Sequence, residues 1–150
     1  MTSSKSLVLA ARIERWPISG SFTISRGAKT EAVTVVAEVS HGGPGGHTGR
    51  GECVPYPRYG ETPEATLAAL QAMQGPLSRG LDRQALQAAM PAGAARNALD
   101  CALWDLEAKT SGQRAWNLLG RPAPSACTTA YTISLGTSEA MAAATAKAAH

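Results

Sequence analysis

The chain has 150 residues, 44% of them hydrophobic, which is enough for one folded core and too much for a short peptide module. Fourteen Lys and Arg residues against eleven Asp and Glu give a formal charge of only +3, and their scattered positions argue against a nucleic-acid partner. No apolar run approaches the ~20 residues of a membrane span and no signal peptide is evident, so we expect a cytoplasmic protein with no membrane partner.

Alternation of apolar and polar residues predicts half-buried β-strands over 6–15 and 31–39, and a third short strand over 48–54. The glycine-rich connection between the second and third strands is typical of a hairpin loop, which predicts an antiparallel meander. Because this connection runs into a strand and not into a helix, it is not a Walker phosphate loop. His41 and His47 lie in it, and a flexible tether without a third ligand nearby favours solvated side chains over a metal site.

Helices are predicted after the strands. Thr62 is a plausible N-cap and Pro63 a plausible first residue of one helix, and a shorter helix follows over 82–90. The longest helix is predicted to have Pro91 in its first turn and Gly112 just past its end.

This longest helix is apolar on two sides and is therefore expected to pack between two layers. Asp105 lies among apolar positions and needs a partner if it is buried. One apolar stripe contains Ala95, Ala98, Leu99, Ala102, Leu103 and Leu106, and the other contains Cys101, Trp104 and Ala108.

Three cysteines, Cys53, Cys101 and Cys127, are widely spaced and form no CxxC motif, which predicts reduced thiols that serve as small core residues. A proline-rich linker over 121–125 follows the helical region. Beyond it, the β-rich composition of residues 127–136 predicts a strand, followed by a helix capped by Thr137 or Ser138. A single parallel strand and helix cannot bury their faces, so we expect the chain to be part of a longer protein.

Three motifs in this order resemble the N-terminal part of dipeptide epimerases of the enolase superfamily, the L-Ala-D/L-Glu epimerase type. They are GECVPYPRYGET over 51–62, GAARNALDCALWDLEAK over 93–109 and TAYTISLGT over 129–137. The resemblance implies an α+β fold: an enolase-like N-terminal capping domain over 1–125, with a three-stranded antiparallel meander plus a helical bundle. It also implies that 126–150 form the first strand and helix of an incomplete TIM-type (β/α) barrel.

The same resemblance implies an isomerase that removes the proton α to a carboxylate and returns it on the other face. In such chemistry Mg²⁺ stabilises the enediolate and a lysine on each face acts as base or acid. In the family these lysines and the metal ligands lie on later barrel strands. We therefore expect no catalytic residue, no metal ligand and no bound cofactor in this chain, which alone should be inactive, whereas the full-length parent should be an epimerase.

The resemblance assigns substrate specificity to two capping-domain segments, 21–30 and 55–62, with Arg26 and the 56–59 stretch in loops. Arg26 is expected to bind a carboxylate of the dipeptide, because a guanidinium can donate to both carboxylate oxygens. The other predicted substrate contacts are Tyr56, Arg58, Tyr59 and Thr132. The alternative is that these residues have no contact with substrate. In that case the prolines stiffen a surface turn, the tyrosines serve in packing, and Thr132 is an ordinary threonine of a strand.

Two other functional interpretations stay open. The first is another enolase-superfamily activity, of the muconate cycloisomerase or o-succinylbenzoate synthase type. The second is a stand-alone, non-catalytic binding module. The expected partner is a small-molecule dipeptide, and the sequence leaves open whether the protein is a homo-oligomer.

Overall fold

The computed structural model describes residues 6–25, 27–42 and 46–149, which divide into two compact units. The first unit contains the chain up to Glu14 together with Val33–Ala123. The second contains Arg15–Ala32 together with Pro124–His150. None of the helices in the described ranges combines the length and the apolar character that crossing a membrane requires.

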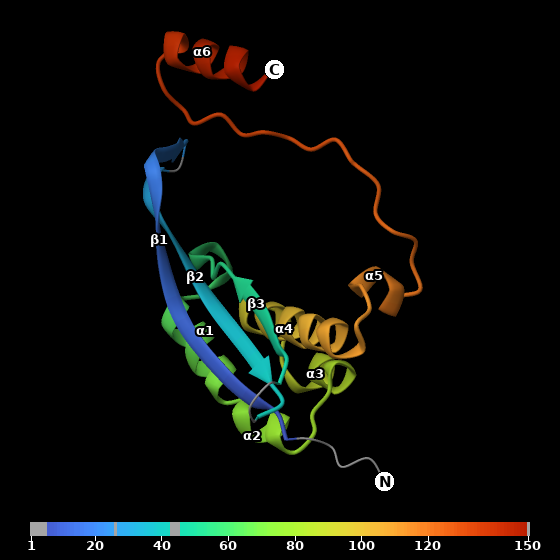
Figure 1. Cartoon of the computed structure of the whole chain (residues 1–150). Helices are drawn as coiled ribbons and strands as arrows, with labels where there is room; N and C mark the ends of the chain where they lie inside the picture. The colour runs from blue at the N-terminus through green and yellow to red at the C-terminus, as the bar shows by residue number, and fades with distance from the viewer. Residues whose placement is uncertain (1–5, 26, 43–45, 150) are drawn as a thin grey trace. The chain divides into compact units, whose positions relative to one another are not determined.

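A three-stranded antiparallel sheet runs in the order β1, β2, β3 (Figure 1). Its strands are β1 (Val8–Ile24), β2 (Gly27–Ser40) and β3 (Thr48–Cys53). The β2–β3 register runs from Val35 opposite Cys53 to Ser40 opposite Thr48. The predicted meander is confirmed.

The first two strands extend well beyond their predicted ends. Residues 21–24 belong to β1 and residues 27–30 belong to β2, so most of the capping-domain segment over 21–30 is strand and not loop. The physical reason is that residues such as Phe22 and Ile24 favour extended backbone, and antiparallel neighbours form ladder hydrogen bonds even where neither face is buried.

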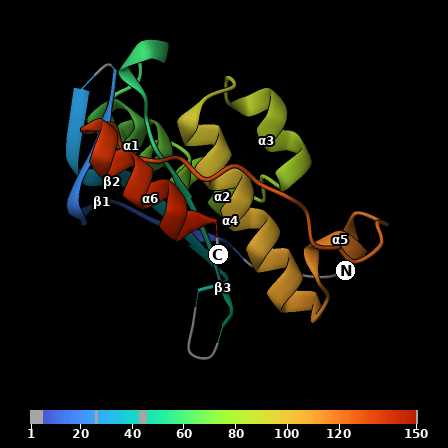
Figure 2. The same cartoon turned by 90° about the horizontal axis from the view of Figure 1, so that it is seen from above.

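Helices follow the sheet in the first unit, and α4 packs against β3 and contacts α1 and α3 (Figures 1 and 2). They are α1 (Pro63–Gln71), α2 (Gln74–Ser78), α3 (Arg83–Ala89), α4 (Ala94–Ser111) and α5 (Ala115–Leu118). Thr62 caps α1 as predicted, because its hydroxyl accepts from the Ala65 amide at 3.1 Å. Asp82 caps α3 in the same way, accepting from the Ala85 amide at 2.8 Å.

The core lies between the sheet and the helices, and two glycines of β3 bring the backbones of β3 and α4 into direct contact. A Cβ at Gly49 would overlap the carbonyl oxygen of Ala102 and would lie 2.7 Å from the Cβ of Leu106. A Cβ at Gly51 would lie 2.7 Å from the Ala102 nitrogen. The buried α4 residues are Ala98, Leu99, Ala102, Leu103 and Leu106, which confirms most of the first predicted stripe.

Two details of α4 differ from the prediction. The helix begins at Ala94 with Gly93 as N-cap, so Pro91 lies before it, whereas Gly112 ends it in the left-handed region (φ 67°) as expected. On its second side, the guanidinium of Arg83 lies 3.4 Å from the centre of the Trp104 ring, but Cys101 is exposed. Within the described part of the first unit, this side is therefore covered at Trp104 and open at Cys101.

In the second unit, residues 127–136 form no regular strand, contrary to the prediction. A regular strand needs a ladder of backbone hydrogen bonds with a neighbouring strand, and the described residues supply only the bond from the Leu135 amide to the Thr23 carbonyl of β1. Helix α6 (Ser138–Ala148) follows, and its predicted cap is confirmed because the Thr137 hydroxyl accepts from the Ala140 amide at 3.2 Å. A domain boundary at residue 125 stays a prediction.

Candidate functional site

The segment after β3 forms one tight turn and not the irregular loop that we predicted. Pro57–Tyr59 make a single turn of 3-10 helix, η1, closed by a hydrogen bond from the Tyr59 amide to the Tyr56 carbonyl at 2.9 Å. Gly60 ends it in the left-handed region (φ 73°), which favours glycine. Pro57 favours this geometry because its ring holds φ near the helical value.

This turn brings three of the predicted substrate contacts together in the first unit. The rings of Tyr56 and Tyr59 are 6.3 Å apart and tilted by 51°. Tyr59 is 75% exposed and Arg58 is also exposed, whereas Tyr56 is half-buried. The turn therefore presents an aromatic pair and a cation, groups suited to binding a small ligand with apolar and anionic parts.

Glu61 is a residue of this site that the sequence analysis missed. One oxygen of its carboxylate accepts from the Ala94 amide at 2.7 Å, and the other accepts from the Tyr56 amide at 3.2 Å. From sequence, an acidic residue just before the Thr62 cap indicates only a favourable charge at the start of α1. Nothing local indicates that it binds the first residue of a helix 33 positions further along the chain.

The other two predicted contacts are not part of this turn. Arg26 lies outside the described residues. Thr132 is an exposed residue of the second unit. Near it, the Ser134 hydroxyl accepts from the Thr23 amide at 2.9 Å, and the Leu135 amide donates to the Thr23 carbonyl at 2.8 Å. These bonds, also missed from sequence, join the segment that carries Thr132 to the far end of β1.

The acidic residues of α4 are held by protein donors. Asp105 accepts from the Lys109 ammonium at 2.6 Å and the Arg50 amide at 2.8 Å, which supplies the partner that we expected for it. Burial alone raises the pKa of this carboxyl, but the Lys109 and Arg50 hydrogen bonds lower it more, so the net pKa is below its usual value. Glu107 pairs with Arg83 at 3.1 Å.

These carboxylates do not fit a magnesium site, because Mg²⁺ needs several oxygen ligands that converge on one point. Among the residues that the structure describes, no group of three or more His, Cys, Asp or Glu side chains could hold a metal ion.

The thiols of Cys53 and Cys101 are poor nucleophiles. Burial, and then the charge of Glu61, raise the pKa of Cys53 to about 11, and its thiol donates to the Val35 carbonyl at 3.6 Å. Partial desolvation, and then the charge of Asp100, also raise the pKa of Cys101. Only Cys53 is a core residue; Cys101 and Cys127 are exposed, so the prediction for these two is wrong. Thiols that stay protonated at neutral pH do not favour covalent catalysis.

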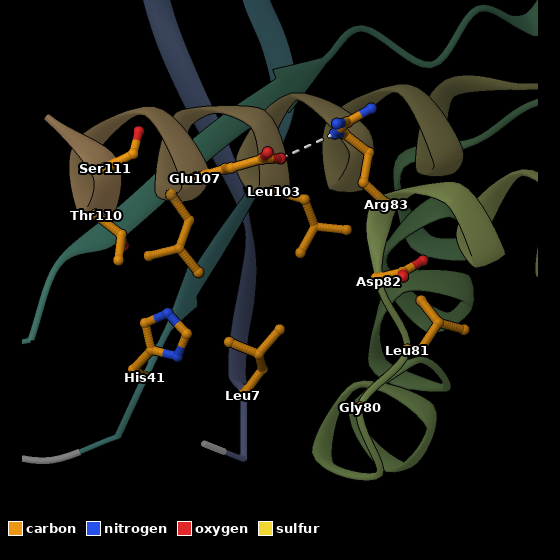
Figure 3. Close-up of a pocket in the computed structure, with 11 residues that line it drawn as sticks. Leu7, His41, Gly80, Leu81, Asp82, Arg83, Leu103, Glu107, Thr110 and Ser111 are labelled. Carbon is orange, nitrogen blue, oxygen red and sulfur yellow. Dashed lines mark hydrogen bonds and ion pairs between the residues drawn. The ribbon is translucent and has the colours of Figure 1, made fainter. Parts of the chain in front are cut away.

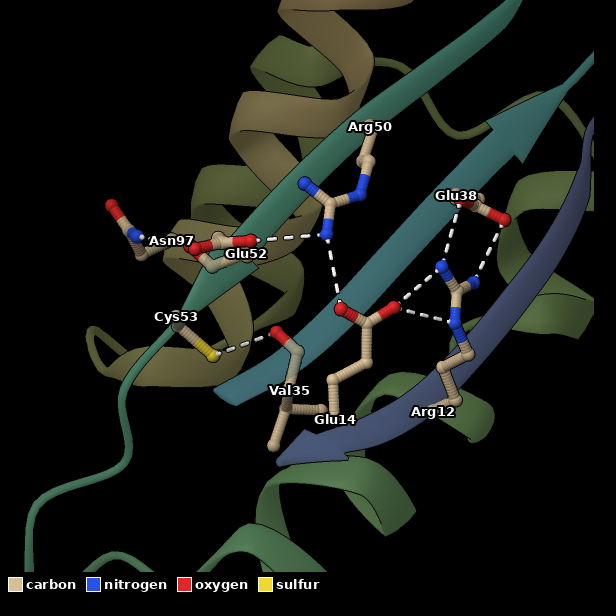
Figure 4. Close-up of polar contacts among 8 residues, drawn as sticks. All are labelled: Arg12, Glu14, Val35, Glu38, Arg50, Glu52, Cys53 and Asn97. Atoms are coloured by element: carbon tan, nitrogen blue, oxygen red, sulfur yellow. Dashed lines mark hydrogen bonds and ion pairs between the residues drawn. The ribbon is translucent and has the colours of Figure 1, made fainter. Parts of the chain in front are cut away.

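Charged side chains on the outer face of the sheet neutralise one another (Figure 4). Arg12 pairs with Glu14 at 2.7 Å and with Glu38 at 2.9 Å. Arg50 pairs with Glu14 at 3.3 Å and with Glu52 at 3.1 Å. The hydrogen bond from Arg12 lowers the pKa of the Glu38 carboxyl. These ion pairs link all three strands. Because the charges neutralise one another, these side chains do not supply a catalytic acid and base.

A mainly apolar cavity of about 450 Å³ lies between α4, the start of α3 and the ends of β1 and β2 (Figure 3). It contains none of the predicted site residues. His41, expected in a solvated loop, is half-buried and lines it, whereas His47 is exposed. The charged groups at its rim have partners, since Asp82 caps α3 and Arg83 pairs with Glu107. The candidate site is therefore the Tyr56–Glu61 turn.

Known proteins of similar sequence and structure agree with this fold. L-Ala-D/L-Glu epimerase of Escherichia coli K12 is 46% identical over 129 residues, which are 86% of this chain and 39% of that protein. N-acetyl-D-glutamate racemase of a Pseudoalteromonas species is 40% identical over 96 residues, 62% of this chain and 30% of that protein. The chain thus spans less than half the length of these relatives.

An enolase family member from Agrobacterium tumefaciens, described with homology to dipeptide epimerases and solved with sodium and L-Ala-L-Glu, has a TM-score of 0.84 and 54% identity. The match covers 94% of this chain and 42% of that one. The dipeptide epimerase of Methylococcus capsulatus, complexed with Mg and L-Arg-D-Lys, has a TM-score of 0.80 and 30% identity over 96% of this chain and 43% of its own.

The family model of the mandelate racemase / muconate lactonizing enzyme N-terminal domain matches residues 7–120. It covers the sheet, the Tyr56–Glu61 turn and the helices through α5. The predicted resemblance is confirmed, and the chain belongs to the mandelate racemase / muconate lactonizing enzyme N-terminal domain family, with the capping-domain fold of the enolase superfamily.

Proposed function

We propose that this chain is the capping part of a magnesium-dependent dipeptide epimerase that acts on L-Ala-D/L-Glu-like dipeptides. The observation that carries the proposal is the 46% identity to an L-Ala-D/L-Glu epimerase across 86% of the chain. Support comes from the 54% identical structure, whose bound ligand is L-Ala-L-Glu.

In this proposal the chain selects the substrate and the rest of the whole protein performs the chemistry. A bound divalent ion supplies stabilisation of the negative charge that develops on the substrate carboxylate when the α-proton leaves. We assign its ligands and the acid–base lysines to the rest of the protein, because Asp105 and Glu107 of α4 are engaged by Lys109, Arg50 and Arg83.

Each predicted contact has a role. Arg26 binds a substrate carboxylate with two parallel hydrogen bonds. Tyr56 and Tyr59 supply aromatic walls, and Arg58 attracts the anionic substrate, an effect that added salt weakens. Thr132 donates a hydroxyl hydrogen bond to the substrate.

The test measures loss of the α-proton signal by NMR when the full-length protein is incubated with L-Ala-L-Glu and Mg²⁺ in deuterated water. We expect exchange and epimerisation by the whole protein and neither by the 150-residue chain. Arg26→Ala should lower kcat/KM for this dipeptide by about 10- to 100-fold, because a charged hydrogen-bond pair contributes about 1.5–3 kcal/mol. Exchange by the 150-residue chain, abolished in Arg26→Ala, would show that the catalytic groups are misassigned.

The relative that is an N-acetyl-D-glutamate racemase favours one second candidate, racemisation of an N-acylated glutamate. Both candidate substrates share an α-proton beside a carboxylate and a glutamyl side chain, so Arg26 keeps its role in either. Including N-acetyl-D-glutamate in the NMR assay separates them. Exchange of this compound without exchange of the dipeptide would replace the first proposal. Lactone or elimination products would indicate a cycloisomerase or synthase activity.

The cytoplasmic location stays a prediction from sequence, and assembly into a homo-oligomer stays an open alternative.

A further inference from the structure

We infer that Glu61 is a positioning residue that fixes the Tyr56–Glu61 turn, and with it both tyrosines, to the first residue of α4. The consequence for catalysis depends on the proposed function. The attachment itself does not, because it rests on contacts within the first unit.

Both carboxylate oxygens of Glu61 accept a hydrogen bond. Its Oε1 accepts from the Ala94 amide at 2.7 Å, and its Oε2 accepts from the Tyr56 amide at 3.2 Å. The Glu61 amide also donates to the Tyr56 carbonyl at 3.4 Å, so Glu61 closes a ring with the residue at the other end of the turn. Hydrogen bonds to an ionised acceptor are about twice as strong as neutral ones.

The start of α4 is suited to receive this carboxylate. Its N-cap, Gly93, provides no side-chain cap, so the amide of Ala94 has no local side-chain acceptor at the positive end of the helix dipole. A Cβ at Gly93 would lie 3.0 Å from the Glu61 Oε1, tighter than ordinary contacts. Glycine at this position therefore leaves room for the Glu61 side chain.

The anchor is also rigid, because the α4 backbone packs directly on Gly49 and Gly51 of β3. A turn fixed to such a helix holds Tyr56 and Tyr59 in place before a substrate arrives. Preorganisation of this kind lowers the cost of binding and acts on affinity more than on the chemical step. We therefore expect loss of Glu61 to raise KM for the dipeptide while leaving kcat nearly unchanged.

The first test measures amide hydrogen exchange by NMR in the 150-residue chain. Glu61→Ala should accelerate exchange at Tyr56 and Ala94 by about tenfold, because both lose a charged acceptor. Glu61→Gln should give a smaller acceleration, because its single amide oxygen replaces only one of the two acceptors. The matched control is Glu64→Gln, because Glu64 is an exposed acidic residue in the first turn of α1.

Three results would overturn the inference. The first is an amide exchange rate at Tyr56 and Ala94 of Glu61→Ala that stays within twofold of the rate in the unmodified chain. A second is the same acceleration in Glu64→Gln, since the effect would then come from charge at the start of α1. The third is equal acceleration at Val39 in the sheet core, since the loss would then be global.

The second test uses the whole protein and the dipeptide assay. We expect Glu61→Ala to raise KM about tenfold with kcat within twofold, and Glu64→Gln to change neither. An unchanged KM in Glu61→Ala would overturn the role in substrate binding. Absence of dipeptide exchange by the unmodified whole protein would instead contradict the proposed function, and the hydrogen-exchange result would still decide whether Glu61 holds the turn.

Discussion

The two units of this chain use the same strands in different ways. In the first, Leu9, Ala11 and Ile13 of β1 pack against a core of fully buried side chains such as Val35 and Leu99. In the second, none of the described residues is buried, and Phe22 and Ile24 of the same strand are only half-buried. The difference teaches that an alternating strand pattern specifies an extended backbone, whereas burial depends on whether another element covers the strand.

The largest expected effect tests whether the core is confined to the first unit. Leu99→Ala should lower the free energy of unfolding by about 3–4 kcal/mol, because it leaves a cavity at a fully buried site. Leu135→Ala, at a side chain 51% exposed in the second unit, should cost less than about 0.5 kcal/mol. Urea denaturation measures both. Equal losses of unfolding free energy in the two variants would contradict a core confined to the first unit.

The next effect concerns the contact of α4 with β3. Gly49→Ala should destabilise the first unit by about 2–3 kcal/mol, because the new Cβ overlaps helix backbone that can move only as a whole. Gly42→Ala is the matched control, since its Cβ would make an ordinary contact of 3.4 Å with the Val8 side chain. Thermal unfolding followed by circular dichroism should show a lower midpoint for Gly49→Ala alone, and an unchanged midpoint would contradict the close packing.

A smaller effect tests how the second unit is held together. Ser134→Ala removes the acceptor of the Thr23 amide, which contributes about 1 kcal/mol. We expect about fivefold faster amide exchange at Thr23, with exchange at Val35 in the first unit unchanged. Thr145→Ala, which removes a hydrogen bond within α6 instead, should not affect Thr23. If Val35 exchange also accelerated in Ser134→Ala, the two units would not be independent.

The smallest effect is a pH dependence confined to the first unit. Because the folded-state pKa of Asp105 is lowered, its contribution is present above its unfolded pKa of about 4 and is lost as pH falls through the lower folded value. Asp105→Asn should therefore weaken the fall in unfolding free energy between about pH 5 and pH 2. Solvent screening limits the difference to roughly 0.5 kcal/mol. Lys109→Met should weaken the same fall, and an unaltered acid dependence in both variants would contradict this assignment.

The candidate site was only partly predictable. The turn at 56–59 was expected to contact substrate because of the family resemblance, and the structure brings its three side chains together. Glu61 was not predicted, because its partner, the Ala94 amide, is 33 residues away and no local pattern connects them. Ser134 was missed for the same reason, since Thr23 is 111 positions away.

By itself the sequence determined what depends on near neighbours along the chain: the helix caps at Thr62 and Thr137, the end of α4 at Gly112 and the buried stripe that contains Leu99. These follow from side-chain spacing and from hydrogen bonds within a few residues. The tertiary structure alone decided that 127–136 form no regular strand and that Cys101 is exposed. Both depend on which distant segments lie beside them, because strand pairing and burial each require a partner surface.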